Sequence, residues 1–156
     1  MKPTFSLALA VIFAAASLST SQAKPVINGT KYMDSVFHDC EVSDNSSCTL
    51  NFTKIPKGKV LTIQNVSCQI SGATSSFLRM VDLKVAAAPT GTNTDTIITI
   101  PSVIVGSSQT GLTYAANSTI FAFSVGGYTP MIETRWSNGV NGDMTCTITG
   151  QFEATP

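Results

Sequence analysis

Apolar residues recur at every second position along most of this chain, which is the spacing that places them on one face of a β-strand. In the segment from Asp143 to Phe152, Met144, Cys146 and Ile148 alternate with threonines. Helical spacing of apolar residues is almost absent, so the sequence predicts an all-β protein. Further strands are expected at 48–53, 60–70, 77–87, 96–105, 112–116, 119–125 and 131–136.

Two of these segments carry irregularities. Between residues 60 and 70 the apolar alternation slips by one position, which predicts a β-bulge near Gln64 and Asn65. Pro101 cannot donate a backbone hydrogen bond, so its segment is expected at a sheet edge or broken at that residue. The segment from Phe77 to Ala87 also fits one face of a helix, but its β-branched residues and missing caps favour a strand.

Short strands bounded by Gly, Pro, Asn and Ser clusters, with no helix between them, are typical of an antiparallel two-sheet β-sandwich. A jelly roll is the first expectation for the topology. An Ig-like sandwich is the alternative, but its core tryptophan lies between the bridged cysteines on an early strand, whereas Trp136 comes late. We expect one domain, residues 24–156.

The first 23 residues have the pattern of a secretory signal peptide. Lys2 precedes an apolar run from Leu7 to Ala16, and small residues surround the expected cleavage point after Ala23. Polar residues interrupt this run too early for a membrane span. We therefore expect a secreted or periplasmic protein with no membrane span.

The four cysteines predict two disulfides, because an even number behind a signal peptide is typical of a disulfide framework. Cys40 and Cys48 flank a short polar loop and are expected to close a local hairpin. Cys68 and Cys146 occupy inward strand positions and are expected to pair within the core. A zinc or redox site is disfavoured, because there is no C-x-x-C motif and only one histidine.

The surface is expected to be polar but weakly charged. Nine basic residues balance nine acidic ones, only 12% of residues are charged, and 39 of 156 are serine or threonine. This composition gives no electrostatic basis for binding nucleic acid. Hydroxyl groups must supply most of the surface hydration.

No catalytic constellation emerges from the sequence. The single histidine, His38, is expected on an inward strand face in a structural role, and neighbouring Ser35 and Asp39 would point away from it, so no triad forms. Asp82, Glu133 and Glu153 are expected to face solvent, which does not resemble the paired carboxylates of a hydrolase. We expect no catalytic residues and no cofactor.

A metal site is likewise not expected. The segment from Asn138 to Asp143 offers oxygen ligands but too few carboxylates for calcium, and an Asn/Gly hairpin turn is favoured. Asn-x-Ser/Thr sites, the acceptors for N-glycosylation, occur at Asn28, Asn45, Asn51, Asn65 and Asn117.

Trp136, Tyr128 and Tyr114 are the candidate ligand platform, because exposed aromatic rings can stack on sugars. The competing interpretation, which we favour for Trp136, is that this residue ends a strand and fills the core. The expected ligand is a carbohydrate or another extracytoplasmic molecule.

Self-association through the strand from Thr145 to Gln151 is also expected, because this strand has no lysine and its outward side is rich in threonine. The alternation from Asp143 to Phe152 resembles the last strand of chaperone–usher pilus subunits, which implies a structural or surface-assembly subunit. The chain lacks their usual penultimate tyrosine, and Cys146 lies in this strand. We rank a non-catalytic binding module first, the assembly subunit second and a secreted hydrolase third.

Overall fold

A computed structural model describes residues 24–41, 46–86, 95–139 and 141–153, and within these ranges the chain forms strands and no helix. This agrees with the all-β prediction. The strands are β1 (Val26–Asn28), β2 (Lys31–Cys40), β3 (Ser47–Asn51), β4 (Val60–Ala73), β5 (Leu78–Ala86), β6 (Asp95–Thr99), β7 (Ser102–Ser107), β8 (Gly111–Val125), β9 (Met131–Trp136) and β10 (Gly142–Glu153).

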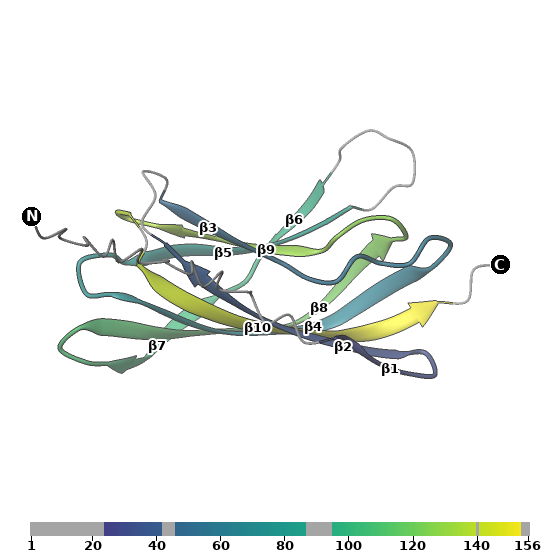
Figure 1. The fold of residues 1–156 in the computed structure, drawn as a ribbon, viewed down its shortest axis with the longest axis horizontal. Coiled ribbons are helices and arrows are strands. Elements are labelled where there is room, and N and C mark those ends of the chain that lie inside the picture. The colour runs from purple at the N-terminus through teal and green to yellow at the C-terminus, as the bar shows by residue number, and fades with distance from the viewer. Residues whose placement is uncertain (1–23, 42–45, 87–94, 140, 154–156) are drawn as a thin grey trace, which may run out of the picture.

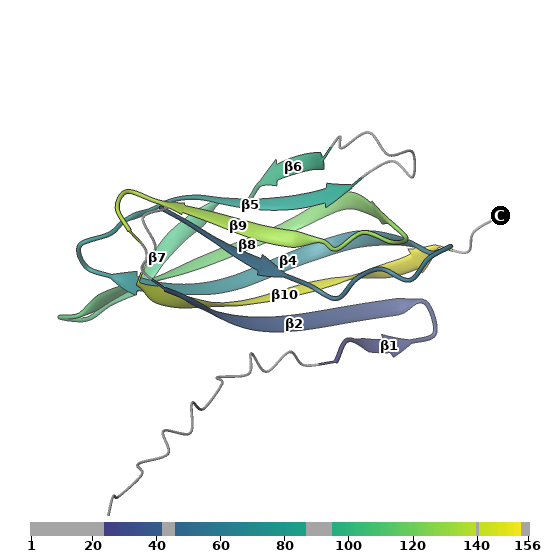
Figure 2. The same cartoon turned by 45° about the horizontal axis from the view of Figure 1, so that its top comes forward.

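The strands form two antiparallel sheets that pack face to face as a β-sandwich (Figures 1 and 2). The six-stranded sheet has the order β1-β2-β10-β4-β8-β7, and the four-stranded sheet has the order β3-β9-β5-β6. β2 pairs with β10, β3 with β9, β4 with β8, and β5 with β6, so the chain folds as nested antiparallel pairs. The sandwich prediction is confirmed.

The inward faces of both sheets form the hydrophobic core. Alternation places every second residue of a strand against the opposite sheet, where burial of apolar surface stabilises the fold. The largest fully buried side chains are Phe52, Leu50, Ile55, Leu61, Ile63, Ile70, Leu83, Ile100, Ile132, Met144, Ile148 and Val66.

The predicted bulge is present in β4. On the β10 side, Thr149 pairs with Asn65 and Gly150 pairs with Ile63, so Gln64 has no partner of its own. The register with β8 shifts at the same point. The bulge is needed because the buried positions change from odd-numbered residues before it, Leu61 and Ile63, to even-numbered residues after it, beginning with Val66.

Pro101 breaks its segment where the chain leaves one sheet for the other. β6 ends before it as an edge of the four-stranded sheet, and β7 begins after it as an edge of the six-stranded sheet. The prediction of two strands at 112–116 and 119–125 is wrong, because β8 continues through Asn117 and Ser118. Those polar residues are accommodated since both pair with β4 inside the sheet.

Both disulfides have the predicted pairing. Cys40 bonds to Cys48 with a Cα–Cα distance of 5.7 Å, and Cys68 bonds to Cys146 directly opposite it on the neighbouring strand. The expected hairpin between Cys40 and Cys48 is wrong, however. β2 and β3 belong to different sheets, so this disulfide links the two layers, while the other cross-links β4 to β10 within one layer.

β10 lies inside the six-stranded sheet, paired with β2 on one side and β4 on the other. It therefore has no free edge, and the part of the self-association argument that treated it as an unprotected edge is wrong. The threonines of β10 still face outward and are partly or fully exposed.

The predicted signal peptide, residues 1–23, lies outside the described residues, and so does the glycosylation acceptor Asn45. The described part of the chain contains no helix long and apolar enough to cross a membrane.

Candidate functional site

The outward side of the six-stranded sheet is the most distinctive surface of the molecule. Three neighbouring strands of this sheet, β10, β4 and β8, present many uncharged hydroxyl and amide side chains on this side. We call this the polar face, and it comprises Thr145, Thr147, Thr149 and Gln151 of β10, Gln64, Asn65, Ser67 and Gln69 of β4, and Asn117 and Thr119 of β8.

Hydrogen bonds across the strands hold several of these side chains in rows. The Thr119 hydroxyl donates to Oδ1 of Asn65 (3.2 Å), whose Nδ2 donates to Oγ1 of Thr149 (3.3 Å). In the next row, the Ser67 hydroxyl donates to Oδ1 of Asn117 (2.6 Å). Such cross-strand pairs fix side-chain rotamers before any ligand arrives, which lowers the entropy cost of binding.

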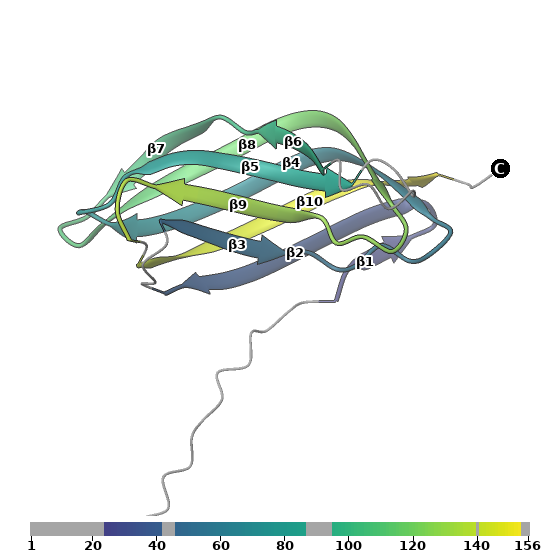
Figure 3. The ribbon, with the colours of Figure 1, turned by 90° about the horizontal axis from the view of Figure 1, so that it is seen from above.

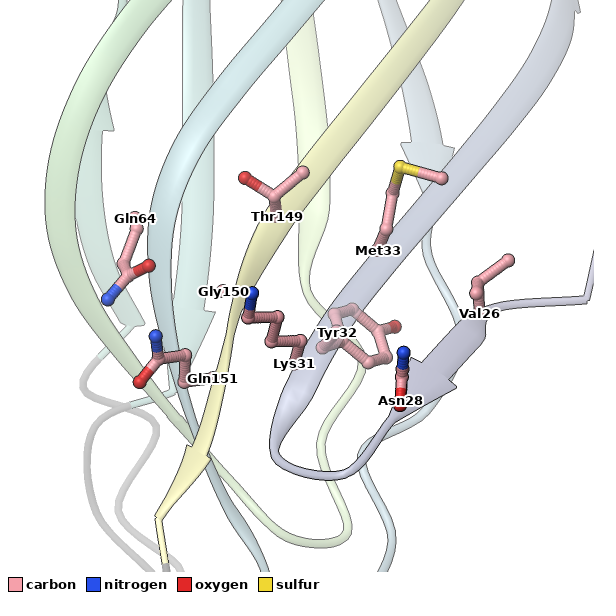
Figure 4. Close-up of a pocket in the computed structure, with 9 residues that line it drawn as sticks. All are labelled: Val26, Asn28, Lys31, Tyr32, Met33, Gln64, Thr149, Gly150 and Gln151. Atoms are coloured by element: carbon pink, nitrogen blue, oxygen red, sulfur yellow. The ribbon is translucent and has the colours of Figure 1, made fainter.

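A hollow of about 430 Å³ opens where the bulge interrupts the polar face (Figure 4). It lies between β1, β2, β10 and the bulge of β4. The hollow is lined by Val26, Asn28, Lys31, Tyr32, Met33, Gln64, Thr149, Gly150 and Gln151.

The bulge itself creates this hollow. Without a partner in the ladder, Gln64 joins Asn65 so that two consecutive amides lie on the outward side, which regular alternation would forbid. Across from them, a Cβ at Gly150 would lie 2.2 Å from the Thr62 carbonyl oxygen, so a side chain there would force the strands apart. Glycine is therefore required where β10 passes the bulge.

Polar groups in the hollow are available to a ligand. Within the described residues, no side-chain hydrogen bond or ion pair engages Lys31, Gln64 or Gln151. Each primary amide offers two N–H donors and an acceptor oxygen, and Lys31 carries the only charge among the lining residues. Met33 and Val26 add exposed apolar surface at one side.

Below the hollow, Tyr32 is fixed to the core. Its hydroxyl donates to Oδ2 of Asp34 (3.1 Å), which also accepts from the backbone N–H of Thr53 (2.7 Å). Burial, reinforced by the Asp34 carboxylate, raises the pKa of Tyr32, so its phenol stays protonated. Its ring also packs edge-on against Phe152. Tyr32 thus forms a rigid floor and is not a titrating group at neutral pH.

An exposed aromatic residue lies on β8, opposite the bulge that borders the hollow. In the β4–β8 ladder Ile63 pairs with Ala122 and Asn65 with Thr119, which leaves Phe121 in the segment opposite Gln64. Phe121 is 75% exposed, the highest value among the large apolar residues that the structure describes, and Phe123 on the same side of β8 is also exposed. Neither phenylalanine was predicted to be exposed, because the expected division of β8 into two strands hides the alternation that places even-numbered residues inward.

The predicted aromatic platform is wrong. Trp136 and Tyr114 are core residues, 2% and 4% exposed, and their rings meet edge to face at 5.9 Å. The indole N–H of Trp136 donates to Oγ1 of Thr134 (3.1 Å). Tyr128 is half-buried between β8 and β9, at the far end of β9 from Trp136. The competing interpretation of Trp136 as a core residue is therefore correct.

The residues considered for catalysis do not converge. His38 is half-buried on the inward side of β2, whereas the Ser35 hydroxyl accepts a hydrogen bond from Thr147 on the polar face (2.9 Å). The expectation that Asp82 faces solvent is wrong. It is buried on β5, where its neighbours in the sheet are Thr99 of β6 and Glu133 of β9, and it accepts a hydrogen bond from the Thr99 hydroxyl (2.8 Å).

Glu133 is opposite Asp82 on the neighbouring strand but is committed to an ion pair with Lys84, and Arg135 lies 3.4 Å away. The hydrogen bond from Lys84 is the main reason that the pKa of Glu133 is lowered. Glu153 is exposed, as predicted, and accepts a hydrogen bond from Thr62 (2.5 Å). Among the described residues, no group of three or more His, Cys, Asp or Glu side chains could hold a metal ion.

Comparison with known proteins gives no relative: no family model, curated protein or solved structure matches this chain.

Proposed function

We propose that this protein is a non-catalytic binding module that holds a saccharide in the hollow at the bulge of the polar face. The observation that carries the proposal is a hollow lined by the unengaged amides of Gln64 and Gln151 and by the hydrogen-bonded hydroxyl of Thr149, with the exposed Phe121 on the strand next to Gln64. Gln64 and Gln151 supply hydrogen-bonding groups, and Phe121 supplies an apolar plane next to them.

A saccharide fits this chemistry for two reasons. Its neighbouring hydroxyls each donate and accept, as a primary amide does, so a few fixed amides can satisfy several hydroxyls at once. Its ring also has an apolar C–H surface that packs on an aromatic plane. Nucleic acid is a poorer match, because the hollow has one cation and the whole chain has no net positive charge.

Lys31 adds a preference within this class. Its ammonium group borders the hollow and makes no ion pair within the described residues (Figure 4). A uronic acid, which carries a carboxylate on a sugar ring, would pair with it. We therefore expect uronic-acid oligosaccharides to bind more tightly than neutral ones, and Lys31→Gln to remove that difference.

The test is binding to a panel of immobilised neutral and uronic-acid oligosaccharides. The double variant Gln64→Ala/Gln151→Ala should weaken binding by about thirtyfold, since each hydrogen-bonding amide contributes about 1 kcal/mol. Gln69→Ala is the matched control, because this exposed glutamine lies on the same face of β4 but outside the hollow. Equal binding by the double variant and the control would contradict the proposal, and so would a panel with no bound saccharide.

Phe121→Ala provides a second, independent variant. The ring is largely exposed, so its removal should leave stability nearly unchanged while weakening saccharide binding. Phe77→Ala is its control, an exposed phenylalanine just before β5 of the other sheet. If both variants bind as the unmodified protein does, the ring has no part in recognition.

Two further proposals concern topology and location. The nested pairing of β2 with β10, β3 with β9, β4 with β8 and β5 with β6 supports a jelly roll with β1 and β7 added at the edges. The two disulfides support a location outside the cytoplasm, where conditions are oxidising. The signal-peptide pattern of residues 1–23 predicts the same location. Edman sequencing of the exported protein should begin at Lys24.

A further inference from the structure

The six-stranded sheet ends in two different edges, β1 and β7 (Figure 3). β1 is three residues long, whereas β7 has six and is bonded to β8 on one side only. An edge strand carries backbone N–H and C=O groups that no neighbour within the sheet satisfies, and these can pair with another chain.

β7 exposes three consecutive apolar residues. Val103, Ile104 and Val105 are 62%, 57% and 60% exposed, although all three are β-branched and favour pairing in sheets. Single exposed apolar residues are common on soluble proteins, but a contiguous apolar run along a strand edge marks an interaction surface.

This edge also lacks the charges that normally prevent pairing between sheets. The chain contains no Asp, Glu, Lys or Arg between Asp95 and Glu133, so neither β7 nor the adjoining β8 has a charged side chain. Natural edge strands are usually guarded by lysines, prolines or bulges. β7 follows Pro101 and has a bulge at Val105, but no electrostatic repulsion opposes a second uncharged strand.

We propose that β7 pairs with β7 of a second copy of this chain, which joins the two six-stranded sheets into one. The occupant follows from the symmetry of the exposed apolar run: Val103, Ile104 and Val105 read the same in both directions about Ile104, and the small residues Ser102 and Gly106 flank them. Antiparallel pairing centred on Ile104 sets Val103 opposite Val105 of the second copy and sets Ile104 opposite itself. Such an isologous contact satisfies both copies at once and closes as a dimer.

The dimer has a consequence for ligand binding, which rests on the proposed function. The two-fold axis of an antiparallel strand pair is perpendicular to the sheet, so the polar faces of both copies lie on the same side. Two hollows then share one continuous surface, and a long saccharide can occupy both. A second site reached on the same ligand molecule strengthens overall binding without any new contact.

The oligomeric state tests the dimer without any saccharide. Sedimentation of the purified protein, with both disulfides formed, should show a dimer that dissociates on dilution. Ile104→Lys should be a monomer at every concentration, because it brings two lysines together at the centre of the contact. Its thermal stability should equal that of the unmodified protein at dilutions where both are monomers, since the side chain is already largely exposed.

Ile27→Lys is the matched control, because Ile27 is 52% exposed on β1, at the opposite edge of the same sheet. It should remain a dimer. The inference is overturned if the unmodified protein is a monomer throughout, if it forms open polymers, or if Ile104→Lys still dimerises. Loss of the dimer in Ile27→Lys alone would assign the contact to β1 and overturn the assignment to β7.

A covalent test addresses the register. Antiparallel pairing centred on residue 104 places the Cα atoms of residue 104 in the two chains about 4.5–5.5 Å apart. A disulfide can span this distance. Ile104→Cys should therefore form a reducible cross-linked dimer under mild oxidation, and Ile27→Cys should not. Equal cross-linking of both variants would indicate random collision and contradict the pairing.

Discussion

The two disulfides should contribute unequally to stability, and their places in the chain set the difference. Cys40 and Cys48 are 8 positions apart, whereas Cys68 and Cys146 are 78 apart. Cross-linking a longer loop removes more conformational entropy from the unfolded chain. The chain-entropy relation gives about 2.6 kcal/mol for the shorter loop and about 4.5 kcal/mol for the longer one.

The packing contributions nearly cancel in this comparison, because all four cysteines are buried to a similar degree. We therefore compare the double variants Cys40→Ala/Cys48→Ala and Cys68→Ala/Cys146→Ala. The second should lose about 2 kcal/mol more free energy of unfolding than the first. Double variants are needed, since a single replacement leaves a thiol that can exchange with the remaining disulfide.

Urea unfolding under non-reducing conditions, followed by tryptophan fluorescence, measures both losses. Trp136 is a suitable reporter because it is buried between the sheets and the chain has no other tryptophan. The reasoning is refuted if the two double variants are equally stable, or if the variant without Cys40–Cys48 is the less stable one. The latter result would show that linking the two layers matters more than constraining the long loop.

Three other predictions follow from individual contacts. Gly150→Ala should destabilise the fold by about 1–3 kcal/mol and remove saccharide binding, because the new Cβ meets the backbone of β4; urea unfolding and the saccharide panel measure the two effects. Lys84→Met should lower the free energy of unfolding by less than about 1 kcal/mol at neutral pH, as measured by urea unfolding. That cost should vanish as pH falls through the lowered pKa of Glu133, because the ion pair stabilises the fold only while the carboxylate is ionised. In a host that glycosylates, a glycan on Asn65 or Asn117 should block the polar face and prevent saccharide binding. Enzymatic removal of the glycan from the purified protein should restore saccharide binding.

The sequence predicted much of the fold because alternation is a local signal. The bulge at Gln64 was visible as a slip in that alternation, and Pro101 as a residue that cannot continue a ladder. The alternation also placed His38 and Cys146 inward, where the structure has them. Strand existence and facing can be predicted in this way because each depends on neighbouring residues only.

What the sequence did not predict depends on contacts between distant segments. Trp136 is buried partly because Gly72 lies against it; a Cβ there would be 2.4 Å from the indole ring. In the sequence, the short separation of Cys40 and Cys48 is typical of a hairpin. Only the sheet to which each strand belongs shows that this disulfide links the two layers. Phe121 could have been identified as exposed had alternation been followed through the polar Asn117, which resembles a turn residue only in isolation.

The central claim, that the hollow at the bulge binds a saccharide, is tested most directly by NMR of the glutamine side-chain amides. Titration with a uronic-acid oligosaccharide should shift the amide signals of Gln64 and Gln151, while the signal of Gln69 stays in place. Shifts confined to residues of the four-stranded sheet, or no shift of Gln64 and Gln151 at saturating oligosaccharide, would contradict the account.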